Sequence, residues 1–106
     1  MITATEASMI SSRVRTGEPT RAELDEAVAN ADICIREAAE AGKAYVRLLF
    51  RDPNKTLTEV ERRHGRILRD HVCDQLKENG FLYAVQADDP LEVKVMWPVR
   101  GADPGL

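Results

Sequence analysis

The sequence lacks the long apolar run of a membrane protein. None of its apolar stretches approaches the roughly 20 residues that a helix needs to cross a bilayer. Residues 1–6 also lack the basic flank and the apolar stretch that open a signal peptide. We therefore expect a protein that is made and kept in a cytoplasm and has no membrane partner.

Cysteine is scarce, which bears on both disulfides and metal sites. Cys34 and Cys73 are the only two cysteines and stand far apart in the chain. In a reducing compartment such isolated cysteines are normally free thiols. His64 and His71 lie seven residues apart, about 10 Å along a helix, which is too far for one metal ion without further ligands. We expect no disulfide, metal or cofactor.

Charge of one sign is missing as well. The 106 residues carry 15 Lys and Arg against 18 Asp and Glu, a net charge of −3, and no segment is strongly of one sign. A nucleic-acid-binding protein usually has a basic excess that neutralises phosphates, so this composition disfavours nucleic acid as a partner. A hydrophobic content of 43% and a charged content of 31% are typical of one small folded domain.

Catalytic motifs are also absent. The sequence contains no G-x-S-x-G, no H-E-x-x-H and no P-loop. The neighbouring acids Asp88 and Asp89 precede Pro90, a pattern typical of a turn rather than of paired catalytic carboxylates. We therefore expect that the protein is not an enzyme.

Helix start and stop signals divide the N-terminal half of the chain. Thr3 or Thr5 can cap a helix over residues 3–16, which the Gly and Pro of residues 17–19 end. Thr20 and Glu23 form a T-x-x-E capping box at the start of a second helix over residues 21–41. The first helix has an apolar stripe with helical spacing, formed by Ala7, Ile10 and Val14.

The C-terminal half combines strands with one more helix. Residues 43–51 alternate as a strand, and residues 81–97 predict a hairpin that turns at 88–90. Two overlapping capping boxes, Thr56/Glu59 and Thr58/Glu61, leave the start of a helix over residues 57–79 uncertain by one turn. The inner stripe of this helix is expected to be Val60, His64, Ile67, Leu68, His71, Val72 and Leu76.

The order ααβαββ predicts one α+β domain over residues 1–97, followed by a flexible tail over 98–106. We expect a three-stranded sheet with strand order 1-3-2 and with the two long helices packed on one face. The other face should then carry four apolar and four charged side chains, which are Tyr45, Leu49, Leu82, Met96, Arg47, Arg51, Lys94 and Glu92.

This second face of the sheet is the best candidate for an interaction surface. So much apolar area on a sheet usually contacts something. The first helix can cover it, because packed layers normally flank one core; otherwise a second copy of the chain or another protein covers it. Ile33, on the acidic outer side of the second helix, is a weaker sign of a contact.

Arginines crowd the outer face of the third helix: Arg62, Arg63, Arg66 and Arg69. Interleaved acids allow Glu59–Arg63 and Arg66–Asp70 pairs four residues apart, which are typical of a solvated helix face. The alternative is a surface that contacts nucleic acid or an acidic partner.

Three structural patterns together point to a known class of proteins. They are Ile35-x-x-Ala38-Ala39-x-x-Gly42, Leu76-x-x-x-Gly80-Phe81-x-x-x-Val85 and Val93-x-Val95-x-Trp97. Over residues 24–97 the chain resembles short proteins of tailed bacteriophages and prophages, described as virion-associated or of unknown function. The resemblance implies an assembly role and supplies no catalytic or ligand residues. The Arg-rich middle of the third helix departs from the pattern.

Three functions follow as hypotheses. The first is a phage-type structural or assembly protein that acts by protein–protein contacts, as a homo-oligomer or with other phage or host proteins. The second is a phage accessory protein that binds and inhibits a host factor. The third is a weak nucleic-acid binder that uses the four arginines of the third helix. The expected location is the cytoplasm of the infected cell, or the virion.

Overall fold

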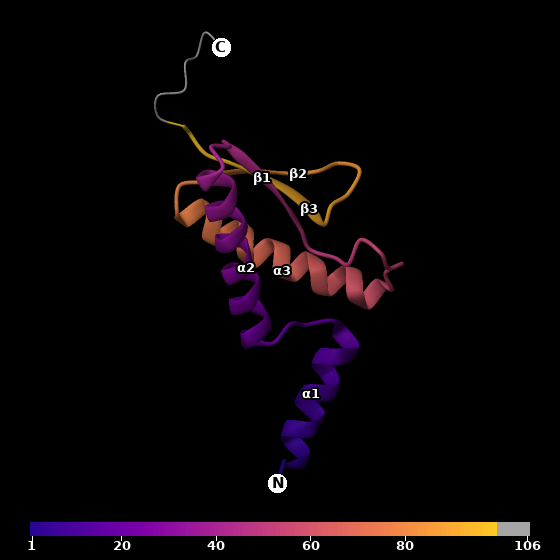
Figure 1. Cartoon of the computed structure of the whole chain (residues 1–106). Helices are drawn as coiled ribbons and strands as arrows, with labels where there is room; N and C mark the ends of the chain where they lie inside the picture. Colours follow the sequence, from indigo (N-terminus) through magenta and orange to yellow (C-terminus); the bar gives the residue numbers. More distant parts are fainter. Residues whose placement is uncertain (100–106) are drawn as a thin grey trace.

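The computed structural model describes residues 1–99 and has the expected α+β order of three helices and three strands (Figure 1). Each boundary lies within two residues of its predicted position. The expected tail begins at residue 98, and its residues 100–106 lie outside the described part of the chain. The elements are α1 (Ala4–Thr16), α2 (Arg21–Glu40), β1 (Tyr45–Leu49), α3 (Glu59–Glu78), β2 (Leu82–Val85) and β3 (Glu92–Met96).

Threonine caps set where the helices start. At α2, the Thr20 hydroxyl accepts from the backbone N–H of Glu23, whose carboxylate accepts from the N–H of Thr20. The same reciprocal box joins Thr58 and Glu61 at α3, so the second of the two predicted boxes starts that helix. Each box satisfies two N–H groups that have no partner inside the helix.

The three strands form one antiparallel sheet in the predicted order β1-β3-β2. β3 is central and pairs with both neighbours, with Val46 opposite Val95 on one side and Tyr83 opposite Val95 on the other. Because side chains alternate along a strand, each row of opposed residues belongs to one face of the sheet.

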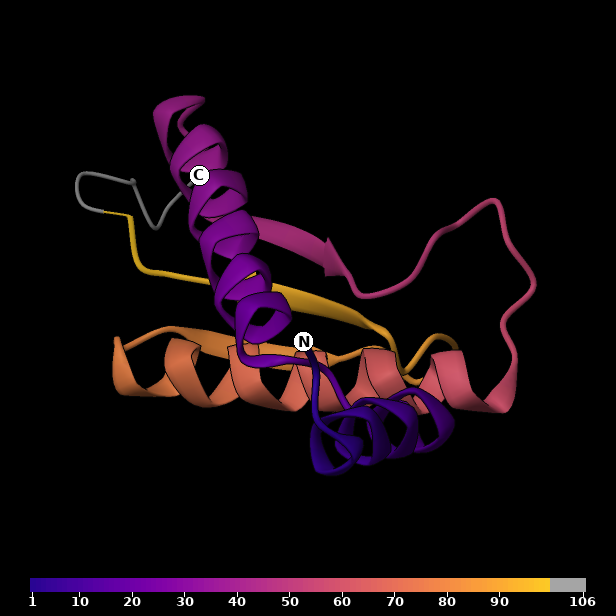
Figure 2. The same ribbon diagram turned by 90° about the horizontal axis from the view of Figure 1, so that it is seen from below.

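Helices α2 and α3 cover one face of the sheet, as predicted, and the core lies between these helices and the sheet (Figure 2). Val93 and Val95 of the central strand are 0% exposed. Leu48 from β1 and Val72 and Leu76 from α3 pack into the same cluster. The alternation in the sequence therefore assigned this inner face correctly.

Helix α1 projects away from the sheet and does not cover its second face (Figure 1). The C-terminal end of α1 packs against α3, and none of the residues of α1 is buried. The molecule is consequently elongated, with extents of 62 × 29 × 21 Å. Of the three covers that the sequence allows for the second face, which are the first helix, a second copy and another protein, the structure excludes α1 of the same copy.

The junction after α1 depends on Gly17. This residue has φ 76°, a left-handed conformation that glycine adopts without strain. A Cβ atom at this position would lie 2.5 Å from the carbonyl oxygen of Val60. The backbone of the junction therefore lies directly on α3, which sets the position of α1.

Candidate interaction surface

The sheet face opposite α2 and α3, here called the outer face, has an apolar row at one end. The register places Tyr45 and Leu82 on either side of Met96. Leu82 is 69% exposed, and Tyr45 is also exposed. The structure thus brings together three residues that the sequence placed on this face.

Charged residues flank the apolar row on the outer face. The next row is Arg47 opposite Lys94, and the Lys94 ammonium lies 4.7 Å from the centre of the Tyr45 ring. A guanidinium nitrogen of Arg47 lies 3.9 Å from a carboxylate oxygen of Glu92, which is opposite the exposed Leu49 in the third row. The outer face is therefore an apolar strip beside charges of both signs.

Strand β2 adds an uncovered edge to this surface. It pairs with β3 only, and its four residues, Leu82–Val85, are all exposed and uncharged. β1, at the other edge, carries Arg47. Charged residues normally protect sheet edges from pairing with other chains, so β2 is the less protected edge.

Arg51 leaves the outer face and pairs with Asp89. It lies beyond the end of β1, and two of its nitrogens donate to the same Asp89 oxygen at 2.8 and 3.1 Å. This hydrogen-bonded ion pair lowers the pKa of the Asp89 carboxyl and raises the pKa of the Arg51 guanidinium. Its structural role is to join the loop after β1 to the β2–β3 turn.

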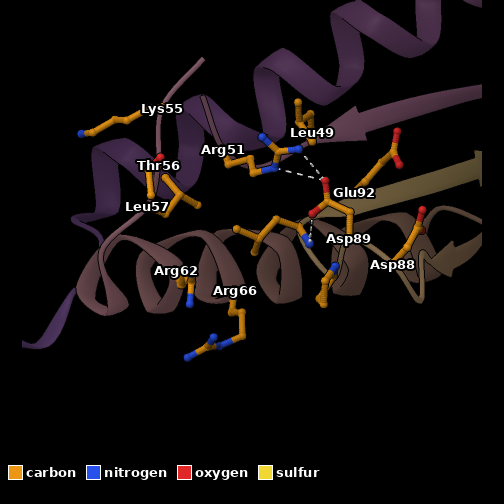
Figure 3. Close-up of a pocket in the computed structure, with 12 residues that line it drawn as sticks. Leu49, Arg51, Lys55, Thr56, Leu57, Arg62, Arg66, Asp88, Asp89 and Glu92 are labelled. Atoms are coloured by element: carbon orange, nitrogen blue, oxygen red, sulfur yellow. Dashed lines mark hydrogen bonds and ion pairs between the residues drawn. The ribbon is translucent and has the colours of Figure 1, made fainter. Parts of the chain in front are cut away.

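A groove of about 680 Å³ lies beside this pair (Figure 3). Its cationic residues are Arg51, Lys55, Arg62 and Arg66. Figure 3 shows that Arg62 and Arg66 point away from the Arg51–Asp89 pair, and that Lys55 lies on the far side of the groove. Because these cationic side chains do not converge on one point, they are not arranged to bind a single anion together.

The four arginines of α3 do not form one stripe. Arg69 is 16% exposed and donates to the carbonyl oxygen of Pro90 at 2.8 Å and to Asp70, so it holds the β2–β3 turn. Arg62 and Arg66 both contact Glu59. Arg63 is exposed and has no ion-pair partner among residues 1–99. The predicted Glu59–Arg63 and Arg66–Asp70 pairs were wrong.

His64, which the sequence places on the inner stripe of α3, holds the junction between α1 and α2. One ring nitrogen lies 3.1 Å from the Gly17 carbonyl oxygen, and the other lies 2.9 Å from a Glu23 carboxylate oxygen. Helical spacing placed His64 on the inner stripe but carried no information on a partner 47 residues earlier. The ring therefore anchors the base of α1.

The apolar stripe of α1 faces solvent. Ile10 is 53% exposed and Val14 is 70% exposed. Helical spacing found the stripe, but periodicity cannot show whether another element lies opposite it. The stripe of α1 is thus a second uncovered surface, which the sequence alone does not reveal.

The remaining candidates stand apart from these surfaces. Ile33 is 51% exposed on α2, beside an ion pair in which Arg36 donates to Asp32 at 2.8 Å. Cys34 is exposed and Cys73 is buried, both as free thiols. Burial raises the pKa of Cys73 to about 11, which keeps the thiol protonated at neutral pH and unreactive as a nucleophile.

The described residues 1–99 lack two features that indicate other kinds of site. In this part of the chain no three His, Cys, Asp or Glu side chains are placed to share a metal ion. None of the described helices combines the length and the apolarity that a membrane crossing requires.

No protein-family model, curated protein or solved structure matches this chain.

Proposed function

We propose that the chain is a small, non-enzymatic structural or assembly protein of the tailed-phage type, which acts by protein–protein contacts as a homo-oligomer. One observation carries the assembly role: the apolar row of Tyr45, Met96 and Leu82 lies on a sheet face that no other element of residues 1–99 covers. Apolar area gathered on one face of a small domain is typical of an interface.

A second copy is the occupant that the charges favour. The outer face carries Arg47 and Lys94 beside Glu92, so it has both signs within one small area. Two such faces related by a two-fold axis can place Arg47 of each copy against Glu92 of the other. Leu82 belongs both to the apolar row and to the uncharged edge strand β2, so a change at Leu82 tests both features of the proposed contact.

The experiment is a measurement of mass in solution over a range of concentrations, by light scattering and native mass spectrometry. We expect an oligomer in the native chain and a shift towards smaller species in Leu82→Lys, because a lysine ammonium must be desolvated in the contact. Ile33→Lys, an equally drastic change at an exposed residue of α2, should leave the mass unchanged. A native chain that stays monomeric at every concentration overturns the proposal.

The phage-type part of the proposal is supported by the patterns within residues 24–97. It places the protein in the infected cell or in the particle. Mass spectrometry of purified particles, compared with lysate of the cells that produced them, tests this. Enrichment of the chain in particles supports a virion-associated protein, and its presence in the lysate alone favours an assembly factor that leaves before completion.

A further inference from the structure

Helix α1 is capped like the other helices but has almost nothing to pack on. The Thr3 hydroxyl accepts from the N–H of Glu6 at its start, and the left-handed Gly17 ends it. A 13-residue helix alone in water is marginal even when it is well capped, because most helix stability comes from packing of an apolar face. A partner outside the monomer that covers the apolar stripe of α1 would therefore stabilise this helix.

The surface of α1 is complementary to itself. At about 100° per residue, Ala7, Ile10 and Val14 share one stripe, and Glu6 and Arg13 lie together along one flank of it. Glu6 and Arg13 are seven residues apart, about 10 Å along the axis, and they do not pair with each other within α1. Neither residue forms an ion pair with any other residue that the structure describes.

We propose that α1 packs antiparallel against α1 of a second copy, about a two-fold axis at Ile10. In this arrangement Ile10 meets Ile10, and the small Ala7 of each helix faces Val14 of the other. Matching flanks of antiparallel helices face each other, so Glu6 of each copy pairs with Arg13 of the other. This pairing rests on the proposed self-association and names one of its contacts.

A parallel arrangement lacks this match. Parallel helices bring the flank of Glu6 and Arg13 against the opposite flank of the neighbour, which carries Ser11 and Arg15 and no acid. Glu6 would then face a serine, and no ion pair would form between the helices. The charges of α1 therefore select the antiparallel pair.

Contacts at the base of α1 fix the helix in a position that leaves its stripe free for this pairing. Gly17 lies on the Val60 carbonyl, and His64 bonds the Gly17 carbonyl oxygen at 3.1 Å, so the junction is fixed to α3. The antiparallel register brings Ile2 of one copy to the junction of the other, next to the exposed Val60. Both ends of the paired helices thus have apolar contacts.

Charge reversal tests the pairing directly. Glu6→Arg alone, or Arg13→Glu alone, places like charges across the two-fold axis and should weaken self-association on the order of tenfold. The double variant carrying both reversals restores opposite charges and should regain native self-association. Inside one helix the double reversal is unfavourable at both ends, so recovery cannot come from a more stable α1.

A cysteine at the two-fold axis provides a second test. In a Cys34→Ser background, Ile10→Cys should form a disulfide-linked dimer under mild oxidation, because the two thiols meet across the axis. Met9→Cys is the matched control, since Met9 is equally exposed but lies on another side of α1. The Met9 variant should stay largely unlinked.

The outcomes separate this inference from the proposed function. The α1 pairing is overturned, and the assembly role is left standing, by two results together. The first is an oligomer that is insensitive to the single charge reversals, and the second is equal disulfide linkage through Cys at residue 10 and at residue 9. A native chain that is monomeric throughout overturns both. Loss of association in each single variant and its recovery in the double variant support the pairing.

Discussion

Helices α1 and α2 begin in the same way and end in different surroundings. Thr3 and Thr20 each cap a helix by accepting from the N–H three residues later. α2 then buries Ala31 and Ala38 against its neighbours, while α1 buries no residue. Caps therefore decide where a helix starts, at about 1 kcal/mol each, but not whether its apolar stripe is covered.

The same contrast separates the two faces of β3. Val93 and Val95 point into the core and are fully buried, whereas Lys94 and Met96 point to the outer face. We therefore expect changes on the inner face to unfold the domain. Changes on α1 and on the outer face should alter association and leave the fold intact.

The largest expected effect comes from Val95→Asp. A carboxylate in place of a fully buried valine has no partner in the core, so we expect a loss of about 4 kcal/mol or more in the free energy of unfolding. Urea denaturation followed by circular dichroism measures it. Met96→Asp, one residue further on the outer face, should change this free energy far less, and equal losses would contradict the assignment of the two faces.

Gly65→Ala is the next largest change. A Cβ at Gly65 would lie 2.6 Å from the carbonyl oxygen of Phe50 and 3.2 Å from the Leu91 side chain, in the interior of the fold. Because a backbone oxygen cannot move aside cheaply, we expect a loss of about 1–3 kcal/mol in the free energy of unfolding, despite the better helix propensity of alanine.

Gly42→Ala is the control for this substitution. A Cβ there meets nothing within 4 Å, and only the φ of +77° opposes it. The cost should therefore be about 1 kcal/mol, measured by the same denaturation. A Gly65 variant as stable as the native chain would show that α3 does not approach Phe50 so closely.

His64→Phe should separate α1 from the rest of the molecule. The variant loses the contacts with Gly17 and Glu23 but keeps a ring of similar size. We expect the domain formed by α2, α3 and the sheet to lose no more than about 1 kcal/mol in its free energy of unfolding. The amides of α1 should exchange with solvent much faster. Hydrogen exchange read by mass spectrometry measures both regions at once.

His71→Phe provides a comparison on the same helix. His71 is also partly buried, and no hydrogen bond from its ring to another residue among 1–99 is present. Exchange in α1 should be unchanged in this variant. Equal acceleration in both variants would mean that the anchor of α1 lies elsewhere.

The smallest expected effect is that of Asp89→Asn, and it depends on pH. The hydrogen bond from Arg51 lowers the folded-state pKa of Asp89, so its stabilisation is fully present above the unfolded value of about 3.9 and is lost as pH falls below it. The melting temperatures of the native chain and the variant should differ at pH 7 and converge towards pH 3. A gap that is constant over this range would contradict the role of the pair.

Much of the fold was predictable because its signals are local. The Thr20–Glu23 box, the alternation around Val93 and Val95, and the short hairpin turn each act over a few residues. The order 1-3-2 and the placement of two helices on one face agree with the structure. The turn at residues 88–90 and the crossover through a helix favour a hairpin in one sheet, and the alternation of apolar residues assigns the face that the helices cover.

The candidate surfaces were only partly predictable. Tyr45, Leu82 and Met96 were correctly grouped, because alternation assigns a residue to a face. The partners of Arg51, His64 and Arg69 were missed, because each lies more than 20 residues away along the chain and no periodicity encodes it. Long side chains reach whichever acceptor the packed elements bring near.

Short-range chemistry along the chain accounts for the helices, the strands and the two-faced character of the sheet. Caps and alternation depend on neighbouring residues and can be read without knowledge of the tertiary contacts. Only the tertiary structure decides that α1 projects from α3 and leaves both its stripe and the outer face uncovered, because burial depends on where distant elements pack.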